Sequence, residues 1–430
     1  MLTVAVIGGG GRSETYCRLG KALFKEQFRI TAICDPLPAR RTLFRNMETE
    51  KVSEFSDYRE LFQANRDGSC PLSDVAIIGT QDNLHFDPAL QAMHLGYDLL
   101  LEKPISNTLE ETRKLAGVAE DLERRVVVCH VLRYTPFYRT VKDLVDSGRI
   151  GQVVSLNATE GVGAWHQTHS FVRGHWSVRA KSSPMILAKS CHDLDIIHWL
   201  MGKRCTSISS AGSLMHFHEG NAPQGAPARC TDGCPVDASC PYNAKRYMAD
   251  QRAWLTHVFD TERTRKRDGN GTATDAEITE WLGVSPWGRC AYRCDNDAVD
   301  HQVVAMDFEG GATGTFTMTA FSEGRNMEIY GTMGVLSGGE FVKAETGADI
   351  ILRDHHGKIH ERINIPEATD EYASHAGGDS GLVATLLDQF AAHDPAALHS
   401  SIADSLHSHE MAWAAERSRE TGQVCHPGDA

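Results

Sequence analysis

The sequence lacks any run of about twenty apolar residues, the length that a membrane-spanning helix needs. It also lacks an excess of basic side chains, since 43 Lys and Arg stand against 57 Asp and Glu, for a formal charge of −14. Nucleic acids and anionic membranes attract positive charge, so we expect neither as a partner. No basic leader precedes the first apolar run, which favours a cytoplasmic location.

The length of the chain predicts two domains. At 430 residues with 41% hydrophobic side chains, the sequence can fill more than one ordinary core. We expect residues 1–130 to form the first domain and residues 131–430 the second. A cysteine-rich insertion is expected at about 213–295, where the sequence is polar and poor in helix signals.

A glycine turn near the N-terminus predicts a dinucleotide site. Residues 3–7 (TVAVI) are typical of a buried parallel strand, Gly8–Gly11 follow at once, and a helix-compatible segment comes next. Such a turn lets the backbone approach a pyrophosphate, which the helix N-terminus then faces with free N–H groups. The third small position of the usual pattern is Ser13. Glycine-rich turns also occur for purely structural reasons, but the strand and helix on either side favour the cofactor.

The second strand, ITAICD, ends in Asp35, which indicates NAD as the cofactor. A carboxylate at this place accepts hydrogen bonds from the adenosine ribose and repels the 2′-phosphate of NADP. Arg40 and Arg41 follow closely and could accept that phosphate, so NADP is the weaker alternative. A purely structural role for Asp35, as a cap of the strand end, is the other interpretation.

Further strands at residues 75–80 and 98–104 alternate with helical segments, a pattern that predicts a Rossmann domain with a doubly wound parallel sheet. Ligands of such sheets bind beyond the carboxyl ends of the strands. The predicted cofactor contacts are Gly8, Gly10, Gly11, Arg12, Ser13, Asp35, Thr80, His85, Glu102, Lys103 and Arg133.

The second domain is predicted to be α+β. Residues 126–136 (VVVCHVLRYTP) are typical of a strand that leaves the first domain, and a helix follows. The later strands HQVVAMDF, ATGTFTMTA and NMEIYGT are closely spaced and joined by short polar turns, which favours an antiparallel sheet.

The densest polar group lies in residues 185–202, MILAKSCHDLDIIHWLMG. If the segment is one helix, Lys189 and His192 share a face with Asp193 or Asp195. A histidine on that face could take a hydroxyl proton, and Asp195 could orient its ring. A solvated helix face is the plainer alternative, but the apolar residues on either side favour a catalytic group of Lys189, His192 and Asp195.

Residues 160–176 (EGVGAWHQTHSFVRGHW) carry aromatic rings that can stack on a sugar, and basic groups that can bind hydroxyls or a carboxylate. A metal site built from the histidines of this segment is not favoured, because their spacing fits no compact motif. The predicted substrate contacts are Tyr134, Trp165, His166, His169, Arg173 and Trp176.

Five of the twelve cysteines are clustered in two short segments. Disulfides are disfavoured in a reducing compartment, and thiols grouped in a polar loop suit a tetrahedral zinc ion. An iron–sulfur cluster, free thiols and redox pairs remain alternatives. The zinc would be structural and would hold an insertion without a core of its own. The predicted ligands are Cys230, Cys234, Cys240 and Cys290, with Cys294 to spare.

By these motifs, the chain resembles the glucose–fructose oxidoreductase / inositol dehydrogenase (Gfo/Idh/MocA) family over nearly its whole length. The resemblance depends on the glycine turn, on EKP at 102–104, on VLRYTPFY at 131–138 and on SCHDLDIIHWLMG at 190–202. It implies a large open sheet in the second domain and a homo-oligomer. It also implies that Lys103 contacts the reacting hydroxyl and that His192 is the acid/base.

One departure from the family concerns the proton relay. The family often has an aspartate four residues before the histidine, where this sequence has Ala188, followed by Lys189. Lys189 could take over the role of the missing carboxylate, with the opposite charge and a different substrate.

Three functions are compatible with these residues. The leading hypothesis is an NAD-dependent dehydrogenase that acts on a carbinol of a sugar, cyclitol or glycoside, with this small sugar-like molecule as its partner. A glycosidase that oxidises its substrate, eliminates the leaving group and then returns the hydride would use the same residues. A non-catalytic NAD sensor is disfavoured, because Lys103 and His192 are both present.

Overall fold

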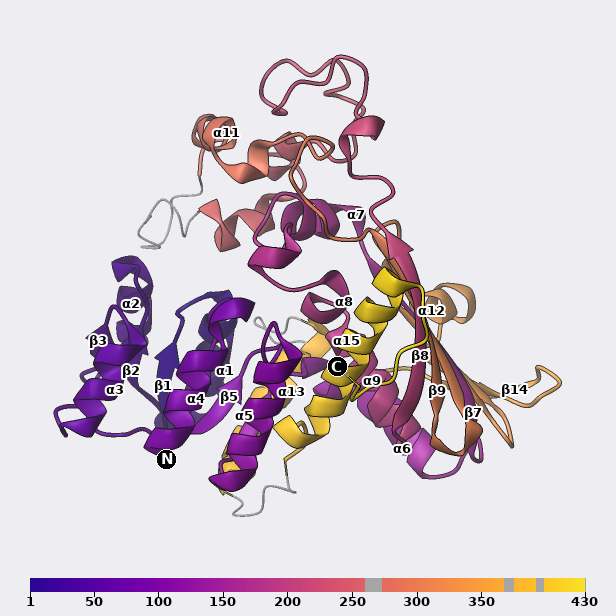
Figure 1. Ribbon diagram of the computed structural model, residues 1–430, viewed down its shortest axis with the longest axis horizontal. Helices are drawn as coiled ribbons and strands as arrows, with labels where there is room; N and C mark the ends of the chain where they lie inside the picture. The colour runs from indigo at the N-terminus through magenta and orange to yellow at the C-terminus, as the bar shows by residue number, and fades with distance from the viewer. Residues whose placement is uncertain (260–272, 367–374, 392–397, 430) are drawn as a thin grey trace.

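The computed structural model describes residues 1–259, 273–366, 375–391 and 398–429. Figure 1 shows three parts: the N-terminal sheet with its helices, a large C-terminal sheet, and a region above them formed largely by residues between the strands β8 and β9. Within the described residues, no helix has the length and apolar character needed to cross a membrane.

The N-terminal sheet has six parallel strands in the order β3-β2-β1-β4-β5-β6. The strands are β1 (Leu2–Ile7), β2 (Phe28–Cys34), β3 (Ser53–Phe55), β4 (Val75–Ile78), β5 (Asp98–Leu101) and β6 (Val126–Val128). The helices are α1 (Gly11–Phe24), α2 (Pro38–Arg45), α3 (Tyr58–Arg66), α4 (Phe86–Leu95) and α5 (Leu109–Asp121). The predicted doubly wound Rossmann sheet is confirmed.

The chain leaves this sheet earlier than the sequence suggests. The predicted strand over residues 126–136 ends at Val128, and Val131–Tyr134 form a short 3₁₀ turn. Because the turn is buried, it places Arg133 and Tyr134 inside the molecule where the two domains meet.

The C-terminal sheet has eight strands in the order β14-β13-β12-β11-β7-β10-β9-β8. Only β7 and β10 pair in parallel, so the sheet is mainly antiparallel, as predicted. The strands are β7 (Val153–Val162), β8 (Cys205–Ser213), β9 (His301–Phe308), β10 (Thr313–Thr319), β11 (Glu323–Gly331), β12 (Val335–Gly339), β13 (Ile350–Arg353) and β14 (Ile359–Ile363).

One face of this sheet is covered by helices and forms the main core. Burial alternates along β9 and β10, so every second side chain points into a cluster that also contains Ile197 and Met411 from helices. The helices of this part are α6 (Pro136–Asp146), α7 (Ala164–His166), α8 (Met185–Ala188), α9 (Cys191–Met201), α12 (Glu340–Thr346) and α15 (Ile402–Thr421).

The C-terminal part of the chain returns to the first domain. Helices α13 (Gly378–Ala384) and α14 (Leu386–Ala391) contribute Leu382, Val383 and Leu386 to the core cluster of strands β1 and β2. Figure 1 shows the long helix α15 between the two sheets. The core cluster of β1 and β2 is therefore completed by residues from the far end of the sequence.

The insertion has a hydrophobic core, which corrects the expectation that it lacks one. Helix α11 (Asp275–Val284) begins with a capping box formed by Thr274 and Glu277. The rings of Trp281 and Trp287 stack with centroids 5.9 Å apart. The buried cluster consists of Trp165, Cys230, Ala244, Tyr247, Leu255, Val258, Phe259, Ala273, Ile278, Trp281, Leu282 and Trp287.

Candidate active site

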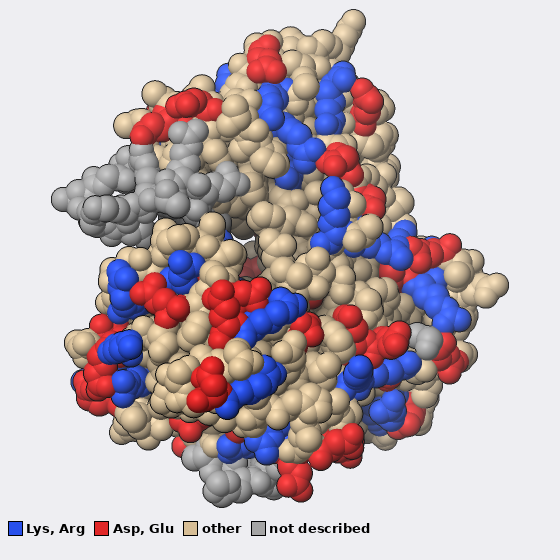
Figure 2. Space-filling view, turned by 60° about the vertical axis from the view of Figure 1, so that its left-hand side comes forward, with Lys and Arg blue, Asp and Glu red and all other residues tan. Residues whose placement is uncertain are grey.

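The turn after β5 carries Lys103 across to the second domain. Its ammonium group donates a hydrogen bond of 2.7 Å to the carbonyl oxygen of Ala188, the last residue of α8. Figure 2 shows a narrow hollow between the lower and upper parts of the molecule. Lys103 thus brings a positive charge from the carboxyl edge of the Rossmann sheet to residues of the second domain.

His192, in the first turn of α9, lies within reach of this charge. Its side chain is buried, and its Nδ1 has no hydrogen-bond partner among the described residues. Burial lowers the pKa of His192 well below its ordinary value, and Lys103 is the strongest charged neighbour that lowers it further. The imidazole is therefore neutral at neutral pH and can accept a proton.

The segment over residues 185–202 is not one helix, which corrects our expectation of a shared helix face. Helix α8 ends at Ala188 and α9 begins at Cys191, so Lys189 and Ser190 lie in the break between them. The Lys189 Nζ lies 3.2 Å from Oε1 of Glu160, near the end of β7.

Glu160 belongs to a buried network of charges. Arg325 of β11 donates to the carboxylates of both Glu160 and Asp193, with Nε 2.7 Å from Oδ1 of Asp193. Ser190 donates to the other oxygen of Glu160 at 3.2 Å. Although burial alone would raise it, the Arg325 and Lys189 cations hold the pKa of Glu160 below its ordinary range. Burial raises the pKa of Asp193, and the Glu160 carboxyl raises it less strongly. Arg325 opposes this rise, but the pKa of Asp193 remains high.

Asp195 does not contact His192 in the way the sequence suggests. Both of its oxygens accept hydrogen bonds of 2.7 Å from the guanidinium of Arg133. The ring of His130 lies near it, with Nε2 3.7 Å from Oδ1 of Asp195. We expected Asp195 to orient the His192 ring. Instead, Asp195 forms a buried ion pair with Arg133, which joins the turn before α6 to α9.

The glycine turn fits a dinucleotide pyrophosphate. Gly8 has a φ of +88°, and a Cβ built there would lie 2.7 Å from backbone atoms of Gly79 and Thr80, so only glycine is accommodated. Helix α1 begins at Gly11, and its N-terminus carries no side-chain cap. Backbone N–H groups of its first turn are thus available to an anion.

Asp35 lies at the end of β2, as predicted, and is buried. Its carboxylate accepts hydrogen bonds from the backbone N–H of Gly9 at 2.9 Å and of Leu37 at 2.8 Å. The Arg40 guanidinium lies 3.3 Å away. The carboxylate therefore anchors the glycine turn, and Arg40 lies against it.

Five other predicted cofactor residues are engaged with protein groups. Thr80 donates to the carbonyl of Leu84 at 2.9 Å. The ring of His85 is buried, with its nitrogens 2.7 Å from Pro104 O and 3.1 Å from Thr80 O. Arg12 pairs with Glu102 at 2.9 Å and also with Asp379, while Ser13 donates to Gly8 O at 2.7 Å. These contacts fix the turn around Lys103.

The segment over residues 160–176 folds into helical turns whose aromatic groups meet the insertion. The ring of His166 lies 5.1 Å from that of Trp254, and the ring of His169 lies 4.8 Å from the same indole. Burial lowers the pKa of His166, and the Lys189 charge lowers it further. The rings of His166 and His169 therefore both lie against Trp254 of the insertion.

The other predicted substrate residues are placed differently. Trp165 is buried in the insertion core, and the indole of Trp176 donates to Asp82 of the first domain at 3.1 Å. Arg173 is only 1% exposed and donates to the carbonyls of Arg289 and Tyr242. The Tyr134 hydroxyl lies 2.8 Å from Ser400 Oγ inside the N-terminal core. Each of these side chains fastens two parts of the chain together.

The four cysteines chosen as zinc ligands line one small cavity of about 20 Å³, together with Tyr242 and Tyr292. All twelve cysteines are free thiols. In the part of the chain that the structure describes, however, no three His, Cys, Asp or Glu side chains are arranged to hold a metal ion. The structure therefore gathers the predicted thiols but does not support the predicted zinc site.

Four residues of the site were not predicted from the sequence: Glu160, Arg325, His130 and His375. The ring of His375 lies 6.3 Å from that of His192, at a turn where both His375 and Ala376 have positive φ angles. Such backbone strain is common at functional sites. Only the glycine-rich segment that follows His375 could have pointed to this turn, because the other three lie at ordinary strand and loop positions.

Two family models match the chain. The first, "Oxidoreductase family, NAD-binding Rossmann fold", matches residues 2–130, and the second, "GFO/IDH/MocA C-terminal domain", matches residues 138–337. Together they cover most of the sequence. The chain belongs to the Gfo/Idh/MocA family of NAD-binding oxidoreductases, which confirms the predicted resemblance.

Relatives agree with this assignment. The protein YteT of Bacillus subtilis is 24% identical over 327 residues, which span 74% of this chain and 72% of YteT. The scyllo-inositol 2-dehydrogenase (NAD(+)) of the same organism is 28% identical over 44% of this chain and 51% of its own length. An oxidoreductase from Agrobacterium radiobacter, solved with NAD+, L-tartaric acid and magnesium, covers 99% of this chain and 98% of its own, with a TM-score of 0.66 at 16% identity.

Proposed function

We propose that this protein is an NAD-dependent dehydrogenase that oxidises a carbinol of a sugar, cyclitol or glycoside. One observation carries the proposal: the Lys103 ammonium reaches residue 188 of the second domain beside a buried, neutral His192. A cation and a base held together at a domain boundary suit the removal of a hydroxyl proton. The scyllo-inositol dehydrogenase among the relatives supports a substrate of this class.

The N-terminal domain supplies the proposed cofactor site. The turn at Gly8–Gly11 and the N-terminus of α1 would hold the pyrophosphate, and Asp35 the adenosine ribose. Arg40 lies on the Asp35 carboxylate, and this carboxylate would repel a 2′-phosphate. NAD is therefore the proposed cofactor rather than NADP.

Bound beyond the strands, the nicotinamide would supply a hydride acceptor for the carbinol carbon. The roles of the protein groups follow from their charges. Nδ1 of His192 is buried, so Nε2 is the nitrogen that we assign to the hydroxyl proton. Lys103 has donors left beyond its bond to Ala188 and stabilises the negative charge that develops on the oxygen.

We further propose that the protein is a homo-oligomer formed through the outer face of the C-terminal sheet. Val154 of β7 and Val303 of β9 point away from the helices and are 49% and 46% exposed. Apolar residues on an open sheet face favour burial against a second copy. Light scattering after gel filtration tests this, and a monomer at micromolar concentration would refute it.

The first experiment follows NADH absorbance and nitrophenolate colour together, with NAD and a panel of nitrophenyl glycosides, free sugars and inositols. NADH that rises in step with substrate loss is the expected result. The alternative, a glycosidase that retains its NAD, gains no support from the family or the relatives. Colour released over many turnovers without net NADH would establish that alternative and overturn the proposed function.

A further inference from the structure

Three cationic side chains converge where the two domains meet. Lys103 arrives from the turn after β5, Lys189 from the break between α8 and α9, and Arg325 from β11. Burial lowers the pKa of Lys189, and the Arg325 and Lys103 charges lower it further against the Glu160 carboxylate. Lys103 Nζ binds the carbonyl oxygen of Ala188 at 2.7 Å, so it reaches the residue that directly precedes Lys189.

The carboxylates around these cations are fewer. Glu160 pairs with both Lys189 and Arg325, and Asp193 pairs with Arg325. Lys103 Nζ has a neutral carbonyl as its hydrogen-bond acceptor, and no ion pair joins it to a carboxylate within the described residues. Three cationic groups thus share two carboxyl groups, and burial raises the pKa of one of them, Asp193, to about 7. Burial also lowers the pKa values of His192 and His166, so these histidines are neutral.

The excess charge falls on the lysines rather than on Arg325. The guanidinium is bound to both carboxylates, whereas within the described residues Lys189 has one ion-pair partner, at 3.2 Å, for its three donors. The Lys189 side chain is 16% exposed, so the protein does not enclose it completely. Burying an ammonium group whose N–H donors lack acceptors costs free energy, and a bound ligand that accepts from them would offset this cost.

We infer that Lys189 binds a carboxylate of the substrate, so that this enzyme oxidises a carbinol of an acidic sugar, a uronate or aldonate, in preference to a neutral one. The inference rests on the proposed dehydrogenase function and specifies its substrate class. Lys103 remains at the reacting hydroxyl, and Lys189, one residue beyond the carbonyl that Lys103 holds, takes the anionic end. A proton-relay role for Lys189 is the competing interpretation.

The test compares matched acidic and neutral sugars, glucuronate with glucose and galacturonate with galactose. Binding is measured by titration calorimetry with saturating NADH, so that the readout needs no turnover. We expect the wild-type protein to bind the acid of each pair at least tenfold more tightly. Lys189→Asn should weaken binding of the acids by about ten- to a hundredfold, the range for hydrogen bonds to charged groups, and leave neutral sugars unchanged.

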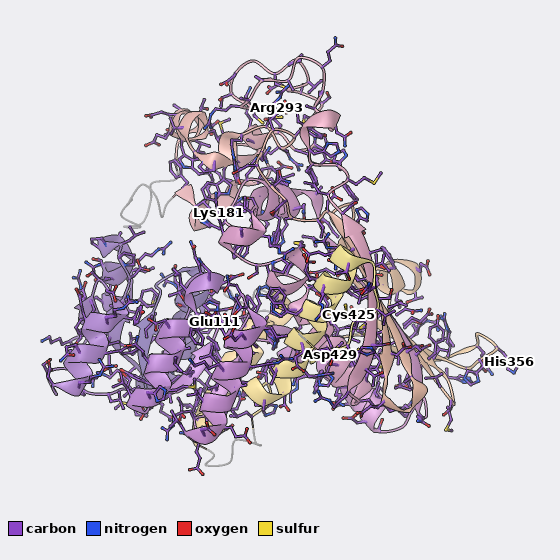
Figure 3. The ribbon with its side chains drawn as sticks, viewed as in Figure 1. Glu111, Lys181, Arg293, His356, Cys425 and Asp429 are labelled. Atoms are coloured by element: carbon purple, nitrogen blue, oxygen red, sulfur yellow. The ribbon has the colours of Figure 1, made fainter. Side chains whose placement is uncertain are left out.

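Two further variants sharpen the comparison. Lys189→Arg keeps the charge and should retain most of the preference for acids, which also guards against a variant that fails to fold. Lys358→Asn makes the same chemical change in the hairpin between β13 and β14, whose tip carries the labelled His356 in Figure 3. Its side chain is exposed, and binding should match the wild type.

Equal affinity of the wild type for both members of each pair would overturn the inference. So would a Lys189→Asn protein that binds acids normally but loses kcat alike on acidic and neutral sugars, since that result indicates a proton relay. These failures differ from failure of the proposed function, which would appear as sugar binding without NADH formation from NAD in any member of the panel.

Discussion

The hydrogen bond from Lys103 Nζ to the carbonyl of Ala188 joins residues 85 positions apart and crosses from the Rossmann domain to the second domain. It ends one residue before Lys189 and four before His192. The backbone at the end of α8 therefore sets the place of the ammonium relative to the base. A shift of either domain would separate the two groups that the reaction needs together.

Replacing Lys103 by Met should lower kcat by roughly a hundredfold or more, because the developing oxyanion loses its nearby charge and donor. Cofactor binding should persist, since the glycine turn and Asp35 are untouched. Turnover is measured by NADH absorbance and cofactor affinity by quenching of protein fluorescence. Lys358→Met is the matched control, and retained turnover in Lys103→Met would remove this residue from the mechanism.

The pH profile should report a neutral His192. Its folded pKa lies below the ordinary 6.5 because of burial and the Lys103 charge, so the basic form persists to lower pH than in a free histidine. We expect kcat/KM for oxidation to stay level as the pH falls to about 6.5 and to decline only below it. An acid limb above that value, or one that survives in His192→Asn, would point to a different base.

The sequence was sufficient for the elements whose signals are local. The apolar run before Gly8 and the glycines themselves dictate a strand, a turn and a helix, and the closely spaced later strands dictate an antiparallel sheet. Lys103 and His192 were predicted because short motifs mark them. The structure confirms the parallel sheet of the first domain and the mainly antiparallel sheet of the second, whereas the roles of Lys103 and His192 stay predictions.

The sequence was insufficient where distant segments meet. Glu160 and Arg325 lie 165 positions apart and pair because β7 and β11 are neighbours in the sheet. The break at Lys189 was not visible in the pattern of residues 185–202, since all of α8 and most of α9 are buried. In the insertion, the core depends on Trp165 and Trp281, which no periodic pattern links.

Replacing Asp195 tests whether its role is structural, as its ion pair with Arg133 indicates, or catalytic, as the sequence motif predicts. Its ion pair with Arg133 is almost fully buried, so Asp195→Ala should leave an unpaired guanidinium inside and lower the free energy of unfolding by about 3–5 kcal/mol. Urea denaturation measures the change. Asp146→Ala removes an exposed partner of Lys142 and should cost less than about 1 kcal/mol. An Asp195→Ala protein of unchanged stability but reduced kcat would restore the catalytic role predicted from the motif.

Binding of an acidic sugar should weaken as the pH rises through neutrality. Burial and, less strongly, the Glu160 carboxyl raise the pKa of Asp193 to about 7, against the opposing effect of Arg325. Asp193 is therefore uncharged below that pH and anionic above it, whereas Glu160 stays ionised because its pKa is lowered. A new negative charge near the substrate carboxylate costs on the order of 1 kcal/mol or more, so the Kd for glucuronate should rise roughly tenfold from about pH 6 to about pH 8.

The coupling between proton binding at Asp193 and binding of the acidic sugar gives a second way to measure this pH dependence. If ionisation of Asp193 weakens binding of the acid, then binding must favour protonated Asp193 and take up protons near neutral pH. Proton uptake is obtained from the dependence of the calorimetric enthalpy on the ionisation enthalpy of the buffer. Asp193→Asn is neutral at every pH and should show neither the uptake nor the rise in Kd, whereas Asp146→Asn should behave as the wild type. Uptake of equal size in Asp193→Asn would assign the titration to another group.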